Sequence, residues 1–222
     1  NKNIKFKHNI AIIPGDGIGP EVILASLKII RKALELDNVC IKEKYYPWGS
    51  TYYKKHKQMM PNDGLDKLKK HDAIFFGAVG DKSIDDDITL WGLRLEICQN
   101  LDQFANVRPS KYMEGINTPL NINIAKNIDW IIIRENSEGE YAGSGGIVHK
   151  GLPLEMGSEL AIFTREGCRR IHEYAFKLAA SRPQKHLTLI TKSNAQRHGM
   201  KLWDKIFYEV SKKYPSVKVD KL

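Results

Sequence analysis

The first part of the chain alternates short apolar runs with amphipathic segments, a pattern that predicts strands followed by helices. The apolar runs at 9–14, 39–46 and 73–76 have the length and composition of strands. After the first run, apolar residues recur with the period of a helix, at Ile23, Leu27, Ile30 and Leu34. Pro20 stands where the first turn of that helix tolerates proline, and a helical segment at 65–68 precedes the third run. We therefore expect an α/β fold with a sheet that is parallel in part.

The second part of the chain continues this alternation. Residues 90–101 have a helical pattern, an apolar run ends at Arg134, and another run occupies 187–190. Thr164 is placed to cap a helix whose inner face would hold Cys168, Ile171, Ala175 and Leu178. A last helix is predicted by its core stripe of Met200, Trp203, Phe207 and Val210. The segment 143–151 is rich in glycine, and we interpret it as a loop.

The segment 111–127 interrupts the pattern. It contains Pro119 and several asparagines but no clear period. A break of this kind is typical of a connection between larger parts of a fold. We place the domain crossover near it, with a first α/β domain at 1–105 and a second domain at 106–222.

Composition limits the classes of protein to consider. At 222 residues and 42% hydrophobic content, the chain is long enough for one or two domains with a core. No apolar run approaches the roughly 20 residues that a membrane helix needs, and no signal-peptide core follows the first residues, so we expect a cytoplasmic protein without a membrane partner. The net charge of +9 comes from scattered lysines, which disfavours nucleic-acid binding and would suit a small anionic substrate.

Cysteine usage and the absence of hydrolase motifs narrow the chemistry further. Cys40, Cys98 and Cys168 are far apart and lack C-x-x-C spacing, so neither a disulfide framework nor a zinc site is indicated. The chain contains no H-E-x-x-H or G-x-S-x-G motif. Zinc chemistry and nucleophilic hydrolysis therefore have no support in the sequence.

The most informative segment follows the apolar run 131–133. There Arg134 and Tyr141 are separated by a polar stretch that contains glycine. Loops at the ends of strands are frequent sites of chemistry. Arginine offers a rigid fork of donors to a carboxylate, and tyrosine offers a phenolic proton. Taken alone, the segment fits a binding site for a small acid and a surface loop with an incidental tyrosine equally well.

Two further segments carry candidate chemistry. The loop 15–20 lies between a predicted strand and a predicted helix, as a phosphate-binding loop does. It has Pro20 where G-x-G-x-x-G requires glycine, and it lacks the Gly-Lys-Ser/Thr of a P-loop, so a tight turn is the better interpretation. Lys192 lies at the exit of the strand at 187–190, where a lysine can act as a base, although a lone lysine is usually a solvated charge.

Five ordered motifs together resemble the isocitrate/isopropylmalate dehydrogenase family. They are the segments 12–22, 77–80, 104–109, 134–141 and 191–194, and they cover nearly the whole chain. Within this family, the segments 90–92, 102–104 and 203–204 are most similar to the tartrate dehydrogenase and D-malate dehydrogenase (decarboxylating) branch. The resemblance implies an isopropylmalate-dehydrogenase-like α/β fold of two domains that is not a Rossmann fold.

The resemblance also implies an activity and the residues that carry it. Members of this family oxidise a 2-hydroxy acid with NAD or NADP and a divalent metal, and then release a carboxylate as CO2; for this chain the resemblance implies a small 2-hydroxy dicarboxylic acid, NAD, and Mg²⁺ or Mn²⁺. By this resemblance, Arg108 and Arg134 would clamp the substrate carboxylates through bidentate hydrogen bonds. Lys192 would take the hydroxyl proton with the help of the metal. Tyr141 would protonate the enol that remains after CO2 departs.

The same resemblance places the cofactor and a partner. Asn194 and the loop of Gly15, Asp16, Gly17 and Ile18 would lie near the nicotinamide. In this family the lysine enters the site from the neighbouring subunit, so a homodimer is implied.

One position departs from the family pattern. Ten residues before Arg108 the family usually carries another arginine, and this chain has Cys98. A thiol cannot form a fork to an anion, and we expect Arg94, one helical turn away, to act in its place. The sequence leaves open which 2-hydroxy acid is the substrate and whether the cofactor is NAD or NADP.

The resemblance runs to Leu222, just before the first metal-binding aspartate of the family. We expect the metal ligands beyond Leu222 and none within this chain, which would make the fold incomplete at the C-terminus. Lysine, tyrosine and arginine cannot replace hard oxygen ligands, so we expect the chain alone to be inactive. The alternative is a non-catalytic member of the family that acts as an interaction or regulatory subunit.

Overall fold

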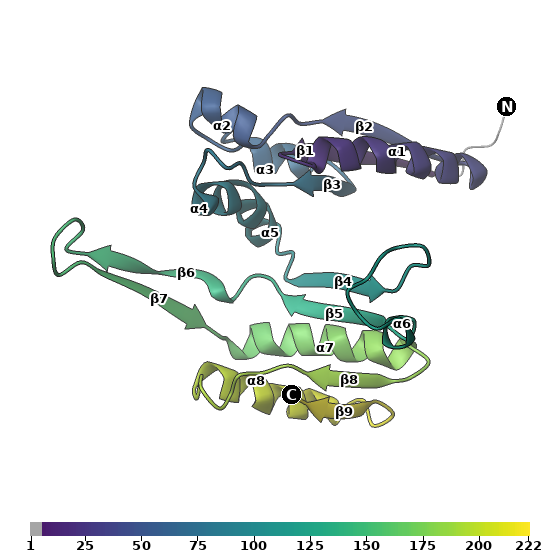
Figure 1. Ribbon diagram of the computed structural model, residues 1–222, viewed down its shortest axis with the longest axis vertical. Helices are drawn as coiled ribbons and strands as arrows, with labels where there is room; N and C mark the ends of the chain where they lie inside the picture. Colours follow the sequence, from purple (N-terminus) through teal and green to yellow (C-terminus); the bar gives the residue numbers. More distant parts are fainter. Residues whose placement is uncertain (1–5) are drawn as a thin grey trace. The chain divides into compact units, whose positions relative to one another are not determined.

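The computed structural model describes residues 6–222, and the chain divides into two compact units between Asp102 and Gln103 (Figure 1). We call the part up to Asp102 unit 1 and the part from Gln103 unit 2. The division lies close to the boundary that the sequence predicts at residue 105. The segment 111–127 instead connects two antiparallel strands within unit 2. The crossover predicted near that segment is wrong, because a polar connection without a period serves equally well between paired strands.

Unit 1 is a three-stranded parallel sheet in the order β2-β1-β3, with helices on both faces. Its elements in chain order are β1 (Phe6–Gly15), α1 (Gly19–Leu36), β2 (Val39–Tyr45), α2 (Ser50–His56), α3 (Gly64–Leu68), β3 (Ala73–Ala78), α4 (Asp86–Thr89), the π-helical turn η1 (Leu90–Leu95) and α5 (Glu96–Asn100). The predicted strands and helices of this part are confirmed, and Pro20 lies in the first turn of α1.

Alternate residues of β1 point to opposite faces of the sheet and enter two separate cores. Ile12 packs with Ile23 and Leu27 of α1. On the other face, Ala11 and Ile13 pack in a cluster with residues of α3, η1 and α5. All of these side chains are buried almost completely. Because β1 is covered on both faces, the loop that leaves it starts from a fixed position.

Unit 2 contains three two-stranded sheets, β4-β5 and β6-β7 antiparallel and β8-β9 parallel. Its elements are β4 (Ala105–Lys111), α6 (Ile122–Ala125), β5 (Asp129–Glu135), β6 (Gly139–Val148), β7 (Met156–Ile162), α7 (Arg165–Ser181), β8 (His186–Leu189), α8 (Gly199–Ser211) and β9 (Lys218–Lys221). Taking residues 6–222 together, no helix combines the length and the apolar character that a membrane crossing requires.

Helix α7 organises the core of unit 2. The side chain of Thr164 accepts a hydrogen bond of 2.9 Å from the backbone N–H of Gly167, so the predicted N-cap is confirmed. Its inner face buries Cys168, Ile171 and Ala175, as predicted. It packs on α8, where the ring centres of Phe176 and Phe207 are 4.9 Å apart, and it also contacts β5 and β8. These contacts fix α7, α8 and the strands β5 and β8 as one body.

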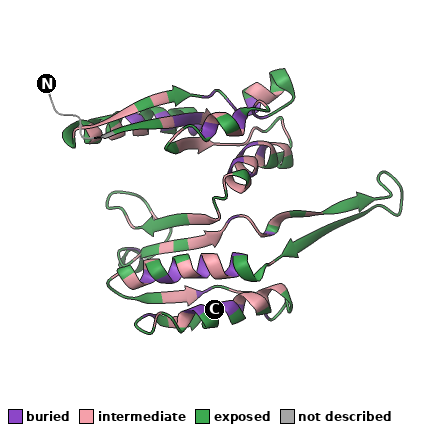
Figure 2. Ribbon diagram, turned by 180° about the vertical axis from the view of Figure 1, so that it is seen from behind, coloured by how far each residue is buried: buried purple, intermediate pink, exposed green. Residues whose placement is uncertain are grey.

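The glycine-rich segment 143–151 is not the loop that the sequence predicts. Residues 143–148 belong to β6, which pairs with β7 in a hairpin that projects from the rest of unit 2 (Figures 1 and 2). A Cβ atom on Gly145 would lie 2.1 Å from the carbonyl oxygen of Ser158 on β7. Glycine here allows two backbones to approach closely, and it does not mark a turn. The loop prediction is therefore wrong for 143–148, whereas 149–151 form the turn of the hairpin.

His172 is a buried titratable group between α7 and α8. It is 3% exposed, its ring centre lies 4.1 Å from that of Trp203, and its Nε2 lies 3.1 Å from the Trp203 carbonyl oxygen. Burial lowers the pKa of His172 from 6.5 to about 4, although this carbonyl and Asp204 favour the protonated form. The folded protein therefore keeps the imidazole neutral at pH values where the unfolded chain binds a proton.

We predict that the unfolding free energy decreases as the pH falls through the window from 6.5 to about 4, and that His172 causes no further loss below it. At about pH 5, the contribution is on the order of 2 kcal/mol. Urea unfolding near neutral pH and near pH 5 should show a smaller pH dependence for His172→Gln than for the wild type. His56→Gln, which changes an exposed histidine of α2, is the control. An unchanged pH dependence in His172→Gln would contradict the prediction.

Candidate active site

Arg134 and Tyr141 form a direct pair where β5 ends and β6 begins. Nη2 of Arg134 donates a hydrogen bond of 2.7 Å to Oη of Tyr141, and the guanidinium carbon lies 4.9 Å from the centre of the tyrosine ring. Arginine has no acceptor, so the tyrosine oxygen accepts in this bond and Arg134 does not use the tyrosine proton. Both side chains are half-buried. The pair places a fork of donors beside a hydroxyl group.

The carboxylate of Glu135 holds the turn between these two residues. Its Oε2 accepts hydrogen bonds from the backbone N–H groups of Ser137 at 2.8 Å and Glu138 at 2.6 Å. Its Oε1 accepts a bond of 2.6 Å from the Ser137 hydroxyl. Hydrogen bonds to a charged acceptor are stronger than neutral ones, so the backbone of this turn is well fixed. Because Arg134 precedes the turn and Tyr141 follows it, the turn determines how they meet.

Asn136 and Arg170 attach the same turn to its neighbours. The backbone N–H of Asn136 donates to the Phe104 carbonyl at 2.9 Å, and its Nδ2 donates to the Gln103 carbonyl at 3.1 Å. Nη2 of Arg170 on α7 donates to the Ser137 hydroxyl at 2.9 Å, and its guanidinium lies 4.5 Å from the Phe104 ring centre. The turn is therefore fixed to both the start of β4 and α7.

Arg108 lies on the same face of the β4-β5 pair as Arg134. The strand register pairs Asn106 with Arg134 and Arg108 with Ile132. Side chains two residues apart on a strand share a face, so Arg108 and Arg134 are diagonal neighbours across the two strands. Arg108 is exposed. Unit 2 thus presents both of these predicted carboxylate-binding arginines on one surface.

Lys192 and Asn194 lie on the turn that connects β8 to α8. Both are exposed, and the backbone N–H groups of Ala195 and Gln196 donate to the Lys192 carbonyl at 2.9 Å. Ser193, between the two, is buried. The structure therefore places the predicted base on a different segment from the Arg134–Tyr141 pair.

In unit 1, the loop of Gly15, Asp16, Gly17 and Ile18 connects β1 to α1. Gly15 has a φ of +69°, and a Cβ atom there would lie 1.9 Å from the carbonyl oxygen of Ala78 on β3, so only glycine fits. Gly17 has a φ of +54° with no atom within 4 Å of the Cβ position, and Ile18 is 59% exposed. One side of the loop is packed on the sheet, and the other side is open to a ligand within unit 1.

The carboxylate of Asp16 fixes this loop from the inside. Asp16 is 8% exposed, and its Oδ1 accepts a hydrogen bond of 2.7 Å from the backbone N–H of Ser50. Its Oδ2 accepts bonds from the Ser50 hydroxyl at 2.7 Å and from the backbone N–H of Gly80 at 3.1 Å. Asp16 therefore joins the loops that follow β1 and β3 to the start of α2. Because these donors occupy its oxygens, Asp16 shapes the loop from within the fold.

Arg94 and Cys98 lie on the last helical segment of unit 1. Arg94 belongs to η1, and π-helical turns of this kind are frequent at functional sites. Cys98 belongs to α5, and both side chains are half-buried. They belong to a different unit from Arg108 and Arg134.

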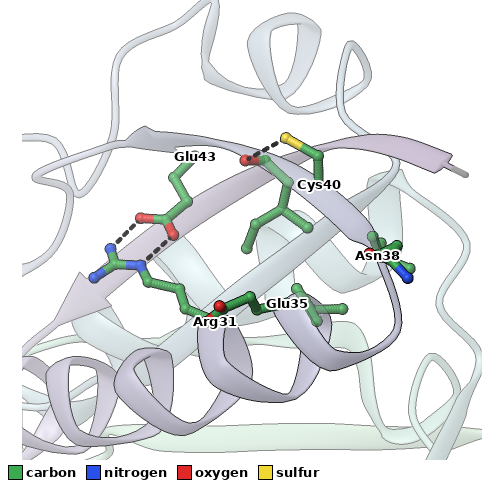
Figure 3. Close-up of a pocket in the computed structure, with 8 residues that line it drawn as sticks. Arg31, Glu35, Asn38, Cys40 and Glu43 are labelled. Carbon is green, nitrogen blue, oxygen red and sulfur yellow. Dashed lines mark hydrogen bonds and ion pairs between the residues drawn. The ribbon is translucent and has the colours of Figure 1, made fainter. Parts of the chain in front are cut away.

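Each unit contains a cavity among its described residues. In unit 1, a cavity of about 500 Å³ lies between α1 and β2 (Figure 3). Its Arg31 and Glu43 are paired through two hydrogen bonds, and none of the predicted site residues lines it. In unit 2, a groove of about 740 Å³ runs along β5 and β8 over the inner face of α7, and Arg134 and Tyr141 contribute to its wall. The groove in unit 2 is the better candidate for binding, because it combines apolar walls with convergent polar groups.

The described residues do not provide a site for a divalent cation. Across residues 6–222, no group of three or more His, Cys, Asp or Glu side chains is arranged to hold a metal ion. Mg²⁺ and Mn²⁺ bind mainly through oxygen ligands, often including one or more carboxylates. The residues described here therefore do not fit the metal that the resemblance implies.

The residues that hold the candidate segments carry only a weak signal in the sequence. Glu135 and Asn136 lie within the motif 134–141, and Asp204 lies within the segment 203–204, where they support the family resemblance without indicating a structural role. Ser50 belongs to none of the motifs. The available signal is a short polar side chain next to the end of a strand, which often bonds to the nearby backbone.

Comparison with known proteins identifies relatives over nearly the whole chain. The sequence matches the isocitrate/isopropylmalate dehydrogenase family over residues 9–222. It is 59% identical to a probable tartrate dehydrogenase/decarboxylase of Agrobacterium vitis over 218 residues, which are 97% of this chain and 61% of that protein. It is 41% identical to the decarboxylating D-malate dehydrogenase of Escherichia coli strain K12 over 214 residues, which are 96% of this chain and 59% of that protein.

Solved structures agree with the sequence comparison. The crystal structure of isocitrate dehydrogenase from Methylococcus capsulatus superposes with a TM-score of 0.84 at 29% identity, over 97% of this chain and 60% of that one. The chain spans between 58% and 61% of the length of the curated relatives that it matches.

We predict that Asp16→Ala loosens the loop between β1 and α1, because three donors lose their acceptor. The loss of unfolding free energy is on the order of 2–4 kcal/mol. Urea unfolding measures this loss, and hydrogen–deuterium exchange of peptides from β1 and β3 locates it. Asp37→Ala, which removes an exposed carboxylate after α1, is the matched control. An Asp16→Ala variant that behaves like Asp37→Ala in both measurements would show that Asp16 is not an anchor.

Proposed function

Because the chain belongs to the isocitrate/isopropylmalate dehydrogenase family, we propose that it serves in the oxidative decarboxylation of a small 2-hydroxy dicarboxylic acid of the tartrate or D-malate type. Its α/β fold is isopropylmalate-dehydrogenase-like. Its relatives include proteins named tartrate dehydrogenase/decarboxylase and decarboxylating D-malate dehydrogenase. The observation that carries the proposal is the Arg134–Tyr141 pair, which joins a carboxylate-binding group to a proton donor.

Arg108 and Arg134 are proposed to bind the carboxylates of the substrate. They share one face of the β4-β5 pair, so two positive forks are presented side by side. A guanidinium fork binds a carboxylate through two parallel hydrogen bonds, which fix both position and orientation. Arg94, in unit 1, stays a prediction that rests on the family resemblance alone.

Lys192 and Tyr141 are proposed to handle the protons of the reaction. Lys192 takes the proton of the substrate hydroxyl group as the alcohol becomes a ketone. The bond to the departing carboxylate then breaks, CO2 leaves, and its electron pair remains in an enolate. Tyr141 donates its proton to the carbon of that enolate, which becomes the ketone product, while the tyrosine oxygen keeps the hydrogen bond from Arg134. Lys192 is proposed to act in the site of the neighbouring subunit of a dimer.

The loop of unit 1 is proposed to bind NAD. When bound, NAD⁺ would supply the acceptor for the hydride that the substrate loses on oxidation. The open side of the loop at Gly17 and the exposed side chain of Ile18 offer an approach to the flat face of a nicotinamide. Gly15 and Asp16 would support this surface from the sheet side. No step is assigned to a metal, because the described residues lack a cation-binding group.

A homodimer is proposed, with the β6-β7 hairpin as a contact surface. A two-stranded hairpin alone is only marginally stable in water. The hairpin exposes large apolar side chains, several of them more than half exposed: Ile147, Leu152, Leu154, Met156 and Leu160. Figure 2 shows that most of the hairpin is exposed. A second copy of the chain would remove this apolar surface from water.

The second candidate function is that of a non-catalytic family member that binds a catalytic relative. The observation in its favour is that residues 6–222 contain no group able to hold the metal. Such a subunit would keep the carboxylate-binding surface of unit 2 without turnover. Co-purification with an active relative, together with a failure to turn over any acid, would favour this function over the first.

We predict that unit 2 binds D-malate through Arg134, and that Arg134→Lys weakens binding by about tenfold or more, because lysine keeps the charge but loses the fork. Calorimetric titration of the chain with D-malate, tartrate, isopropylmalate and isocitrate measures this effect. Arg31→Lys, in the separate cavity of unit 1, is the matched control. Equal affinities of the wild type and Arg134→Lys for every acid would contradict the proposed substrate site.

We predict that Tyr141→Phe leaves D-malate affinity within about threefold of the wild type but lowers turnover by about 100-fold or more, because the proton donor is lost while the guanidinium groups of Arg108 and Arg134 remain. The assay follows NADH at about 340 nm with Mn²⁺ present. It uses the chain alone and the chain co-expressed with the part of the Agrobacterium vitis relative that lies outside the match. Turnover by Tyr141→Phe equal to that of the wild type would exclude Tyr141 as the proton donor. If neither sample turns over any of the substrates, the result would count against the proposed enzymatic activity.

We predict that the chain is a dimer and that Leu160→Lys shifts it toward the monomer, because a charge at the contact surface must be desolvated. Light scattering coupled to size-exclusion chromatography measures the molar mass. Ile29→Lys, at an exposed apolar position on α1, should leave the dimer intact. A monomeric wild type, or equal effects of the two substitutions, would exclude the hairpin as the dimer contact.

A further inference from the structure

We propose that Asp204 is a positioning residue for Lys192, and that it anchors the turn between β8 and α8 so that the lysine points outward. The proposal rests on the proposed role of Lys192 as the proton acceptor. Asp204 acts through Ser193, the residue next to the lysine, and is not itself placed in contact with a substrate.

A buried carboxylate holds Ser193, the residue next to Lys192. The hydroxyl of Ser193 donates a hydrogen bond of 2.7 Å to Oδ2 of Asp204, and Ser193 and Asp204 are 6% and 7% exposed. On the other side of the lysine, the hydroxyl of Thr191 lies 3.7 Å from Sδ of Met200 on α8. The backbone N–H of Thr191 donates to the Leu222 carbonyl at 3.1 Å, which attaches the same segment to the end of β9.

This bond fixes the backbone next to the lysine. Ser193 is turned inward to Asp204, whereas Lys192 is exposed, and the Lys192 carbonyl accepts hydrogen bonds from the backbone N–H groups of Ala195 and Gln196. Loss of the carboxylate would free Ser193, and the lysine would then lose its fixed direction.

The carboxylate is held in place and in its charged form by its surroundings. Nζ of Lys221 on β9 lies 3.2 Å from Oδ2 of Asp204. Burial opposes the charge, but the neighbouring hydroxyl groups and Lys221 outweigh it and lower the pKa of Asp204. The ring of the neighbouring Trp203 packs against that of His172 on α7, with the ring centres 4.1 Å apart, so the segment of α8 that carries Asp204 is attached to the core of unit 2. The anchor is therefore more rigid than the turn that it holds.

The test compares Asp204→Asn and Ser193→Ala with Glu209→Gln, a matched substitution on the exposed side of α8. Two measurements need no turnover: hydrogen–deuterium exchange of residues 190–196, and the rate of acetylation of Lys192 relative to Lys201 and Lys205, read by mass spectrometry. In both site variants, we expect exchange of 190–196 to rise by about tenfold or more. The acetylation ratio should change by about threefold or more. Ser193→Thr, which keeps the hydroxyl, should retain both wild-type values.

Site variants that match Glu209→Gln in both measurements would overturn the proposal. Faster exchange throughout unit 2 with an unchanged acetylation ratio would also overturn it, because Asp204 would then act only on general stability. If Asp204→Asn does not fold, Ser193→Ala decides by the same two measurements. The exchange and acetylation measurements remain valid even if the chain shows no turnover. Conversely, if Asp204 proves not to anchor the turn, D-malate binding by Arg134 is unaffected, so the two proposals can be rejected separately.

Discussion

The loops and turns that carry the candidate site residues after strands β1, β5 and β8 are each held by a carboxylate. In each case the carboxylate accepts hydrogen bonds from residues of the loop. Asp16 fixes the loop after β1, Glu135 closes the turn between β5 and β6, and Asp204 binds the turn after β8. Backbone and hydroxyl donors need new partners where strand pairing stops, and an ionised carboxylate accepts several of them at once. The positions of the proposed binding and reacting groups depend on these acceptors more than on the packing of those groups themselves.

This arrangement separates support from chemistry along each segment. The supporting side chains are short and turned inward, and the residues next to them, such as Arg134 and Lys192, remain available on the surface. The register of β4 and β5 places Arg108 diagonally across from Arg134, at a backbone separation of roughly 7–8 Å. Two positive forks at that spacing suit an acid with two carboxylates better than an acid with one.

The helices with a strong hydrophobic period could be predicted from the sequence. The segments whose structure depends on hydrogen bonding between strands could not. The helices α1, α7 and α8 place apolar residues at helical spacing, and the predicted positions Ile23, Ile171 and Phe207 are buried. The hairpin of β6 and β7 was missed because glycine is a turn signal in sequence, whereas at Gly145 it permits the close approach of Ser158. The crossover was misplaced because a polar connection has no pattern that distinguishes a link between domains from a link between strands.

By itself, the sequence determined the order of the elements, the family resemblance and the types of chemical group available, since each depends on which residues occur and in what order. It left Arg134 and Tyr141 as an even choice between a binding loop and an incidental one. Only the tertiary structure brought these two side chains to 2.7 Å, put Arg108 on the same face and turned Ser193 inward to Asp204. The reason is physical: the direction of a side chain depends on strand register and on hydrogen-bond partners distant in the sequence, and neither is encoded in local spacing.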